Sequence, residues 1–193
     1  MANWCLSEYV IEGDAKELKN LYDLMSGLQE RKEPTIRNGF GTAWLGCLVD
    51  ALGRSWEEVS CRGSWYNLDF DGNALSFNTE TAWSPCGEVF DLVCEKYPTL
   101  RYYYRSEEPG NALYCTNDRE GRYFTDRFYV DVRTPDEEYC SEYFSDLHSV
   151  FEWLEGILDT RIQSRQDIDA MIAQWQKDGA DAYCYINEFQ ILD

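Results

Sequence analysis

The segment Thr81-Ala82-Trp83-Ser84-Pro85 contains the residue types in this sequence that best suit a binding site. It joins an expected strand to the first turn of an expected helix, where free backbone N–H groups can hold an anion. Trp83 adds a flat surface on which a ligand can stack. Neighbouring strand ends bring further polar side chains to this place, and these are Glu80, Arg105, Glu107 and Glu108. We therefore predict a ligand or partner groove here, with packing of Trp83 over the loop as the structural alternative.

The residues that could perform catalysis lack the neighbours that catalysis needs. His148 is the only imidazole, and it is expected on the surface of an acidic helix, so a Cys–His nucleophile pair is not indicated. Adjacent carboxylates such as Glu57-Glu58 resemble the pairs that glycosidases use, but 36 acidic residues produce such pairs by chance. A hydrolytic site near Trp83 that uses Glu107 or Glu108 is the enzymatic alternative. We expect a non-enzymatic protein.

The sequence also lacks the ligand spacing that metal and cofactor sites need. Asp69, Asp71, Asn73 and Glu80 have the spacing of calcium ligands in an EF-hand loop, but Ala74 stands where that loop requires glycine. A hairpin turn at Asp71 explains this stretch better. The eight cysteines are spread along the chain without the close spacing of zinc or iron–sulfur sites. We expect reduced, mostly buried thiols and no cofactor.

The elements that position these residues follow from apolar periodicity and turn residues. The sequence predicts a strand, a helix, a short inserted helix, two strands, a helix and a strand. Their expected ranges are 3–12, 15–30, 43–53, 59–70, 74–81, 85–96 and 100–106. A hairpin of strands at 112–116 and 122–132 follows, and the chain closes with helices at 146–158 and 164–179 and a strand at 182–192.

This order indicates an α+β fold of the ferredoxin-like type. Without the inserted helix it reads βαββαβ, which forms an antiparallel sheet with helices on one face. The hairpin and a C-terminal ααβ unit extend that sheet. We predict a ferredoxin-like core over residues 1–133 and an acidic extension over 134–193, packed on the same core.

Three short segments resemble a known family. They are Ala2-Asn3-Trp4-Cys5, Glu80-Thr81-Ala82-Trp83-Ser84-Pro85 and Ser106-Glu107-Glu108-Pro109-Gly110. They are similar to the YubB-like proteins with a ferredoxin-like domain, which occur in phages, plasmids and conjugative elements. The resemblance covers about residues 1–133 and implies the fold and a mobile-element origin, but no activity. "Ferredoxin-like" names the fold here and implies no iron–sulfur cluster.

The charge of the chain limits what it can bind. With 17 basic and 36 acidic residues its net charge is −19, which opposes binding to phosphate groups and anionic lipids. The sequence shows no secretion signal and no apolar run of membrane-spanning length. We therefore expect a cytoplasmic protein without a membrane partner, and nucleic-acid binding is disfavoured.

The leading hypothesis is an interaction protein of a mobile element that binds a basic host or element protein. Two alternatives make opposite electrostatic predictions. Residues 134–193 hold 14 acidic and 3 basic residues, and this density suits a DNA mimic of the antirestriction type. Nucleic-acid binding would instead need arginines and exposed tyrosines on one sheet face. The arginines in question are Arg62, Arg101, Arg105, Arg119, Arg122 and Arg127.

Overall fold

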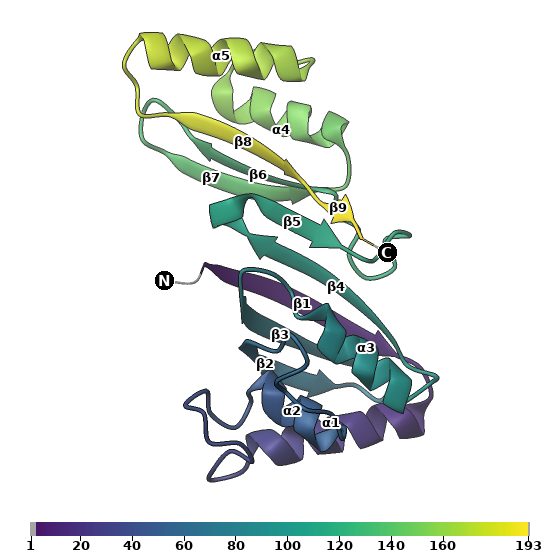
Figure 1. The fold of residues 1–193 in the computed structure, drawn as a ribbon. Helices are drawn as coiled ribbons and strands as arrows, with labels where there is room; N and C mark the ends of the chain where they lie inside the picture. Colours follow the sequence, from purple (N-terminus) through teal and green to yellow (C-terminus); the bar gives the residue numbers. More distant parts are fainter. Residues whose placement is uncertain (1–2, 193) are drawn as a thin grey trace. The chain divides into compact units, whose positions relative to one another are not determined.

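A computed structural model describes residues 3–192, which form an α+β protein (Figure 1). The chain divides into two compact units. The first unit comprises residues 1–118 and 192–193, and the second comprises residues 119–191. The sequence placed this boundary at residue 133 and expected one shared core. Each unit instead has a core of its own, because Val130 and Val132 pack with the helices that follow them in the chain.

The first unit is built on an antiparallel sheet. Its strands are β1 (Trp4–Glu12), β2 (Gly63–Phe70), β3 (Ala74–Ala82), β4 (Arg101–Glu108) and β5 (Leu113–Thr116). Within this unit they follow the order β2-β3-β1-β4-β5, and every neighbouring pair is antiparallel. Alternation along β1 turns Cys5, Ser7, Tyr9 and Ile11 to the buried face of the sheet.

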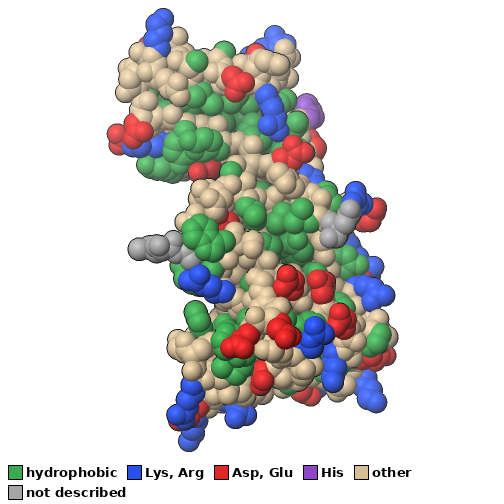
Figure 2. Space-filling model, viewed as in Figure 1, with side chains coloured by type: hydrophobic (Ala, Val, Ile, Leu, Met, Phe, Trp, Pro, Cys, Tyr) green, Lys and Arg blue, Asp and Glu red, His purple; other side chains and the backbone are tan. Residues whose placement is uncertain are grey.

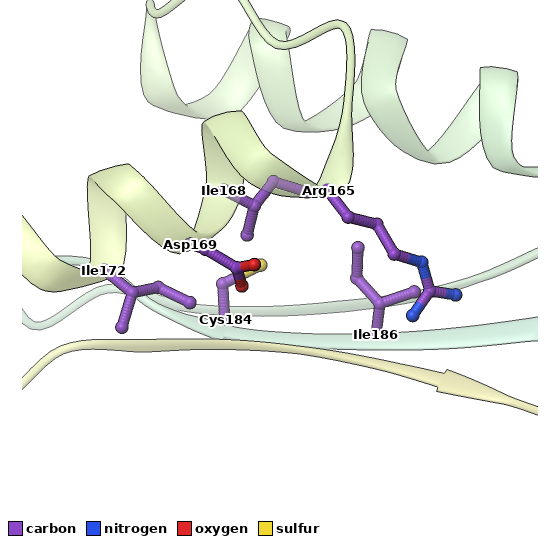
Figure 3. A pocket seen from close by; sticks show the side chains of 6 residues that line it. All are labelled: Arg165, Ile168, Asp169, Ile172, Cys184 and Ile186. Atoms are coloured by element: carbon purple, nitrogen blue, oxygen red, sulfur yellow. The ribbon is translucent and has the colours of Figure 1, made fainter.

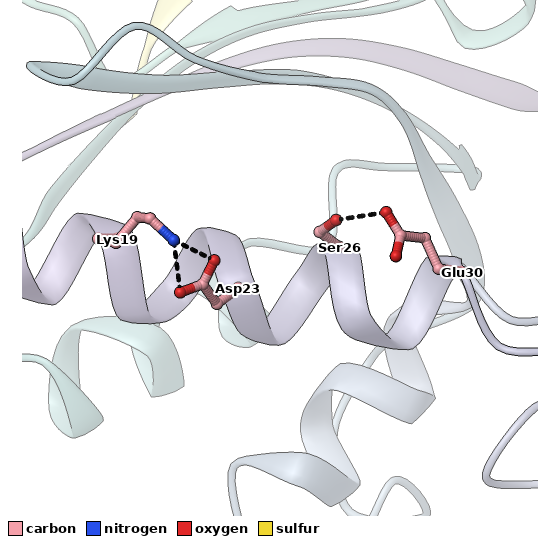
Figure 4. Close-up of polar contacts among 4 residues, drawn as sticks. All are labelled: Lys19, Asp23, Ser26 and Glu30. Carbon is pink, nitrogen blue, oxygen red and sulfur yellow. Dashed lines mark hydrogen bonds and ion pairs between the residues drawn. The ribbon is translucent and has the colours of Figure 1, made fainter.

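Three helices pack on that buried face, namely α1 (Ala15–Gln29), α2 (Leu45–Ala51) and α3 (Gly87–Lys96). The carboxylate of Asp14 accepts hydrogen bonds from the backbone N–H groups of Lys16 and Glu17, so α1 begins where the sequence predicts. The outer side of α1 carries contacts between residues four positions apart (Figure 4). Lys19 pairs there with Asp23, and the Ser26 hydroxyl donates to Glu30.

Aromatic rings form the centre of this core. The Tyr9 ring lies between 4.3 and 6.3 Å, centroid to centroid, from the rings of Phe77, Phe90, Tyr102 and Tyr104. Tyr9 is 1% exposed, and its hydroxyl has no hydrogen-bond partner among residues 3–192. The core of the first unit therefore relies on ring packing at Tyr9, without a polar anchor.

The second unit pairs a small sheet with two helices. In chain order its elements are β6 (Phe128–Arg133), β7 (Tyr139–Phe144), α4 (Leu147–Leu158), α5 (Arg165–Lys177), β8 (Tyr183–Glu188) and the short β9 (Gln190–Ile191). The strands β7, β6 and β8 form one antiparallel sheet in that order. None of the described helices, in either unit, is both long and apolar enough to cross a membrane.

The predicted hairpin around residues 117–121 is wrong. β5 pairs with β4 in the first unit, whereas β6 pairs with β7 and β8 in the second. After β5, the side chain of Asn117 takes over the hydrogen bonding to β4, since its Oδ1 accepts from the N–H of Tyr104 at 2.8 Å and its Nδ2 donates to the carbonyl of Tyr102 at 3.0 Å. The sequence also missed β7, a partly exposed strand of mixed polar and aromatic residues.

Acid should remove stabilisation from the start of α4. The Asp146 carboxylate accepts a 2.9 Å hydrogen bond from the N–H of Ser149, and this bond lowers the pKa of Asp146 below its ordinary value. A lowered pKa in the folded protein stabilises it above the unfolded pKa of about 4, and this stabilisation is lost as the pH falls through the folded pKa.

The matched variant is Asp146→Asn, because asparagine caps a helix without titrating. Urea unfolding of both proteins at neutral and acidic pH measures the effect. We expect the stability advantage of the wild type over this variant to shrink below about pH 4. A difference that stays constant with pH would contradict the assignment of Asp146 as a charged cap.

Candidate functional site

The candidate residues lie around the face of the first sheet that is turned away from α1, α2 and α3, which we call the open face. Along β1 this face carries Trp4, Leu6, Glu8, Val10 and Glu12, since these alternate with the buried residues. Trp4 is 48% exposed and Leu6 is 52% exposed. Two large apolar side chains on one strand face are therefore accessible to a partner.

Two of the predicted carboxylates flank Leu6. Leu6 is paired with Glu80 of β3 on one side and with Glu107 of β4 on the other. The two glutamates thus stand on the open face about two strand spacings apart, which is roughly 10 Å between their Cα atoms. The structure brings together these two members of the predicted groove, with an apolar side chain between them.

Trp83 lies at the end of the open face that Trp4 occupies. It follows Ala82, which is paired with Trp4, and its N–H donates to the carbonyl of Asn3 at 2.9 Å. Trp83 is 47% exposed and has a backbone φ of +74°, in the left-handed region that bulky residues rarely adopt. The hydroxyl of Thr81 donates to the carbonyl of Ser84 at 2.8 Å and so shapes the turn that leads to α3.

Glu108 has a different environment from the rest of the predicted groove. It is 1% exposed, and its two carboxylate oxygens accept hydrogen bonds from the N–H groups of Gly110 and Asn111 at 2.8 and 3.0 Å. These bonds cap a single 3-10 turn, η1 (Pro109–Asn111). The structure therefore gives Glu108 a capping role beside the open face, because a buried carboxylate needs such donors.

The segments that carried the family resemblance meet at this end of the sheet. Trp4 is paired with Ala82, and Leu6, the residue directly after the first segment, is paired with Glu107. A Cβ atom on Gly110 would lie 2.3 Å from the side-chain amide of Asn3, so the first and third segments approach each other closely here. Ala2, the first residue of the quoted segments, lies outside the described residues.

Arg105 does not offer the cationic surface that nucleic-acid binding would need. Its side chain is 11% exposed, and its Nη2 donates to the carboxylate of Glu8 at 3.0 Å across the β1–β4 pair. On the open face it stands with Arg101 and Tyr103 of β4. The other proposed arginines do not all share this sheet, since Arg119, Arg122 and Arg127 belong to the second unit.

The groups considered for nucleophilic chemistry have ordinary structural environments. Burial raises the pKa of the Cys86 and Cys184 thiols to about 12 and that of Cys115 to about 11, so these thiols are protonated at neutral pH. His148 is on the surface of α4 with an 82% exposed side chain, and its Nε2 is 3.4 Å from Glu152 (Figure 2, purple). The expectation of mostly buried cysteines is confirmed, since six of the eight are buried.

A small cavity in the second unit lies between α5 and β8 (Figure 3). Its volume is about 220 Å³, and its walls include Ile168, Ile172 and Ile186. The guanidinium of Arg165 extends away from Asp169 and is 3.5 Å from the carboxylate of Glu188. The cavity is smaller than the roughly 300–1,000 Å³ of typical ligand pockets, so it does not support a ligand site.

The sequence analysis missed Trp4 and Leu6 as site residues, although strict alternation with buried positions along β1 could have identified their exposed face. It also missed the aromatic side chains of the loops around α2, for which no periodic signal exists. Within residues 3–192, no group of three His, Cys, Asp or Glu side chains comes together in a way that could hold a metal ion.

Comparison with models of known protein families, with curated proteins and with solved structures finds no match to this chain.

Proposed function

We propose that this chain is a non-enzymatic interaction protein that binds a basic protein segment on its open face. The observation that carries the proposal is the exposure of Trp4, Leu6 and Trp83 at one end of that face, since exposed apolar groups that lie together mark interaction sites. Aromatic residues are enriched in protein interfaces and dominate their binding energy. The left-handed backbone at Trp83 adds support, because strained residues cluster at binding sites.

The charge on the open face favours a basic partner. Strand alternation and register place five carboxylates on it, compared with the two guanidinium groups of Arg101 and Arg105. The carboxylates are those of Glu8, Glu12, Asp69, Glu80 and Glu107. Acidic side chains also gather on the face of the first unit drawn in Figure 2. A lysine- or arginine-rich segment with an apolar side chain would complement Glu80, Leu6 and Glu107.

We further infer that the first unit has the ferredoxin-like topology. The order β1-α1-β2-β3-α3-β4 along the chain and β2-β3-β1-β4 across the sheet supports this inference, with α2 as an insertion. The convergence of the three quoted segments at one end of the sheet supports kinship with the YubB-like proteins. A mobile-element origin and a cytoplasmic location belong to the same proposal.

The test uses the full chain as immobilised bait in a host lysate, at low and at high salt. We expect a basic protein that is retained at low salt, released at high salt, and lost from the variants Trp83→Ala and Glu80→Gln. Tyr185→Ala and Glu58→Gln are the matched controls, because Tyr185 is exposed in the second unit and Glu58 is exposed outside the open face. Retention that is equal in all variants, or insensitive to salt, would overturn the proposal.

A further inference from the structure

The first unit contains an aromatic cavity that is separate from the open-face residues. Its volume is about 490 Å³, within the range of small-molecule pockets. The loop before α2 and the segment before β2 line this open cavity, and the lining residues include Asn38, Phe40, Trp44, Trp56 and Arg62. Apart from Arg62, which the nucleic-acid alternative named, these side chains have no role in the proposals above.

The walls of this cavity are rings held in defined orientations. Phe40 and Trp44 are stacked with centroids 5.5 Å apart and planes at 19°, and Trp56 meets Trp44 edge-on at 5.3 Å and 65°. A backbone bridge to Ser64 holds Trp44 against β2. A Cβ atom on Gly46 would lie within 2.4 Å of the Trp44 ring, so glycine makes room for that ring. Such walls suit a flat aromatic guest, which can pack against ring faces and edges.

The cavity residues also carry two hydrogen-bond donors without acceptors. The indole Nε1 of Trp44 and the amide Nδ2 of Asn38 are buried and have no partner among residues 3–192. The Asn38 orientation is fixed, because its Oδ1 already accepts from the N–H of Phe40 at 3.0 Å. Trp44 is 2% exposed. Buried donors without acceptors are destabilising, but both atoms are shielded from solvent, so they are not themselves ligand contacts.

The single charged residue among those lining the cavity is Arg62. A cation at this position is distinctive in a chain of net charge −19. We propose that the cavity binds a small planar aromatic anion, whose ring packs against Phe40, Trp44 and Trp56 and whose anionic oxygens face Arg62. Arginine is well suited to a carboxylate or phosphate group.

The probe is 2-naphthoate, which is a flat ring system with one carboxylate. We expect it to bind the full chain with a Kd of about 1 mM or tighter, as ligand efficiency allows for a fragment of this size. In ¹H–¹⁵N spectra it should shift the indole N–H signal of Trp44, assigned from its loss in Trp44→Phe. Phe40→Ala should weaken binding about fivefold. Arg62→Gln, or the neutral analogue 2-naphthalenemethanol, should weaken it roughly tenfold.

Tyr66→Ala and Arg54→Gln serve as controls, because both residues are exposed and lie outside the cavity lining. Circular dichroism checks that every variant is folded. No binding at about 5 mM would overturn the proposal. Equal binding by Phe40→Ala and wild type would overturn the site, and equal binding of the neutral analogue would overturn the anionic specificity. Failure here would leave the open-face proposal intact, because none of these residues carries it.

Discussion

Tyr9→Ala should lower the free energy of unfolding by about 3–5 kcal/mol, the usual loss when a large buried ring is truncated. The reason lies in the four rings that surround Tyr9, the nearest of which has its centroid at 4.3 Å. Tyr9→Phe should instead leave stability unchanged or raise it by about 1 kcal/mol, because it removes a buried hydroxyl without a partner. Urea unfolding of the three proteins gives both values.

The control for this pair is Tyr66→Ala, since Tyr66 is a tyrosine of the same sheet that is 40% exposed. Its loss should change the free energy of unfolding by less than about 1 kcal/mol. If Tyr9→Phe were destabilised by as much as Tyr9→Ala, the hydroxyl would be making an essential hydrogen bond. The ring-packing account of this core would then be wrong.

Cys86 and Cys184 should be almost inert to thiol reagents in the folded protein. Burial raises the pKa of both thiols from 9.0 to about 12. At pH 8 this leaves roughly 1000-fold less thiolate than an ordinary cysteine has, and the thiolate is the reacting form. Burial of the two side chains restricts access by the reagent further.

Titration with Ellman's reagent in native buffer and in urea tests this. Among the eight thiols we expect Cys140 to react early, because it lies half-buried on β7, and a fast phase should disappear in Cys140→Ser. The rates in urea should be uniform. Rapid labelling of Cys86 or Cys184 in native buffer, identified by mass spectrometry of peptides, would contradict the structure.

Local patterns were enough to predict most elements of this fold. The side chain of Asp14, which caps α1 through the N–H groups of Lys16 and Glu17, marks the start of that helix, and the Asp71-Gly72 turn marks the β2–β3 hairpin. In that turn the Asp71 carboxylate accepts hydrogen bonds from the backbone N–H groups of Asn73 and Ala74. A hairpin turn therefore explains why an aspartate stands at position 71. Each of these signals is complete within a few residues, so tertiary context does not alter it.

The errors concern partners that are distant in sequence. β5 and β6 are consecutive strands, and consecutive strands usually pair. Instead β6 pairs with β7 and β8, and its Val130 and Val132 join Val150 and Leu154 in a separate core. Contacts between distant residues also explain why the structure separates Glu108 from the other carboxylates of the predicted groove. Glu80 and Glu107 share a face through β1, whereas the buried setting of Glu108 depends on the fold of η1, which residue types do not reveal.

The left-handed backbone of Trp83 places two selective demands on one position. Folding alone favours glycine there, because a φ of +74° is free of steric conflict only without a Cβ atom. Partner binding, as proposed, favours the large ring. A library screened only for thermostability should therefore drift toward glycine at residue 83, and one screened for binding should retain tryptophan. Such a trade-off between stability and activity is typical of functional positions. Residue 83 is therefore the position at which selection for stability and selection for binding should favour different amino acids.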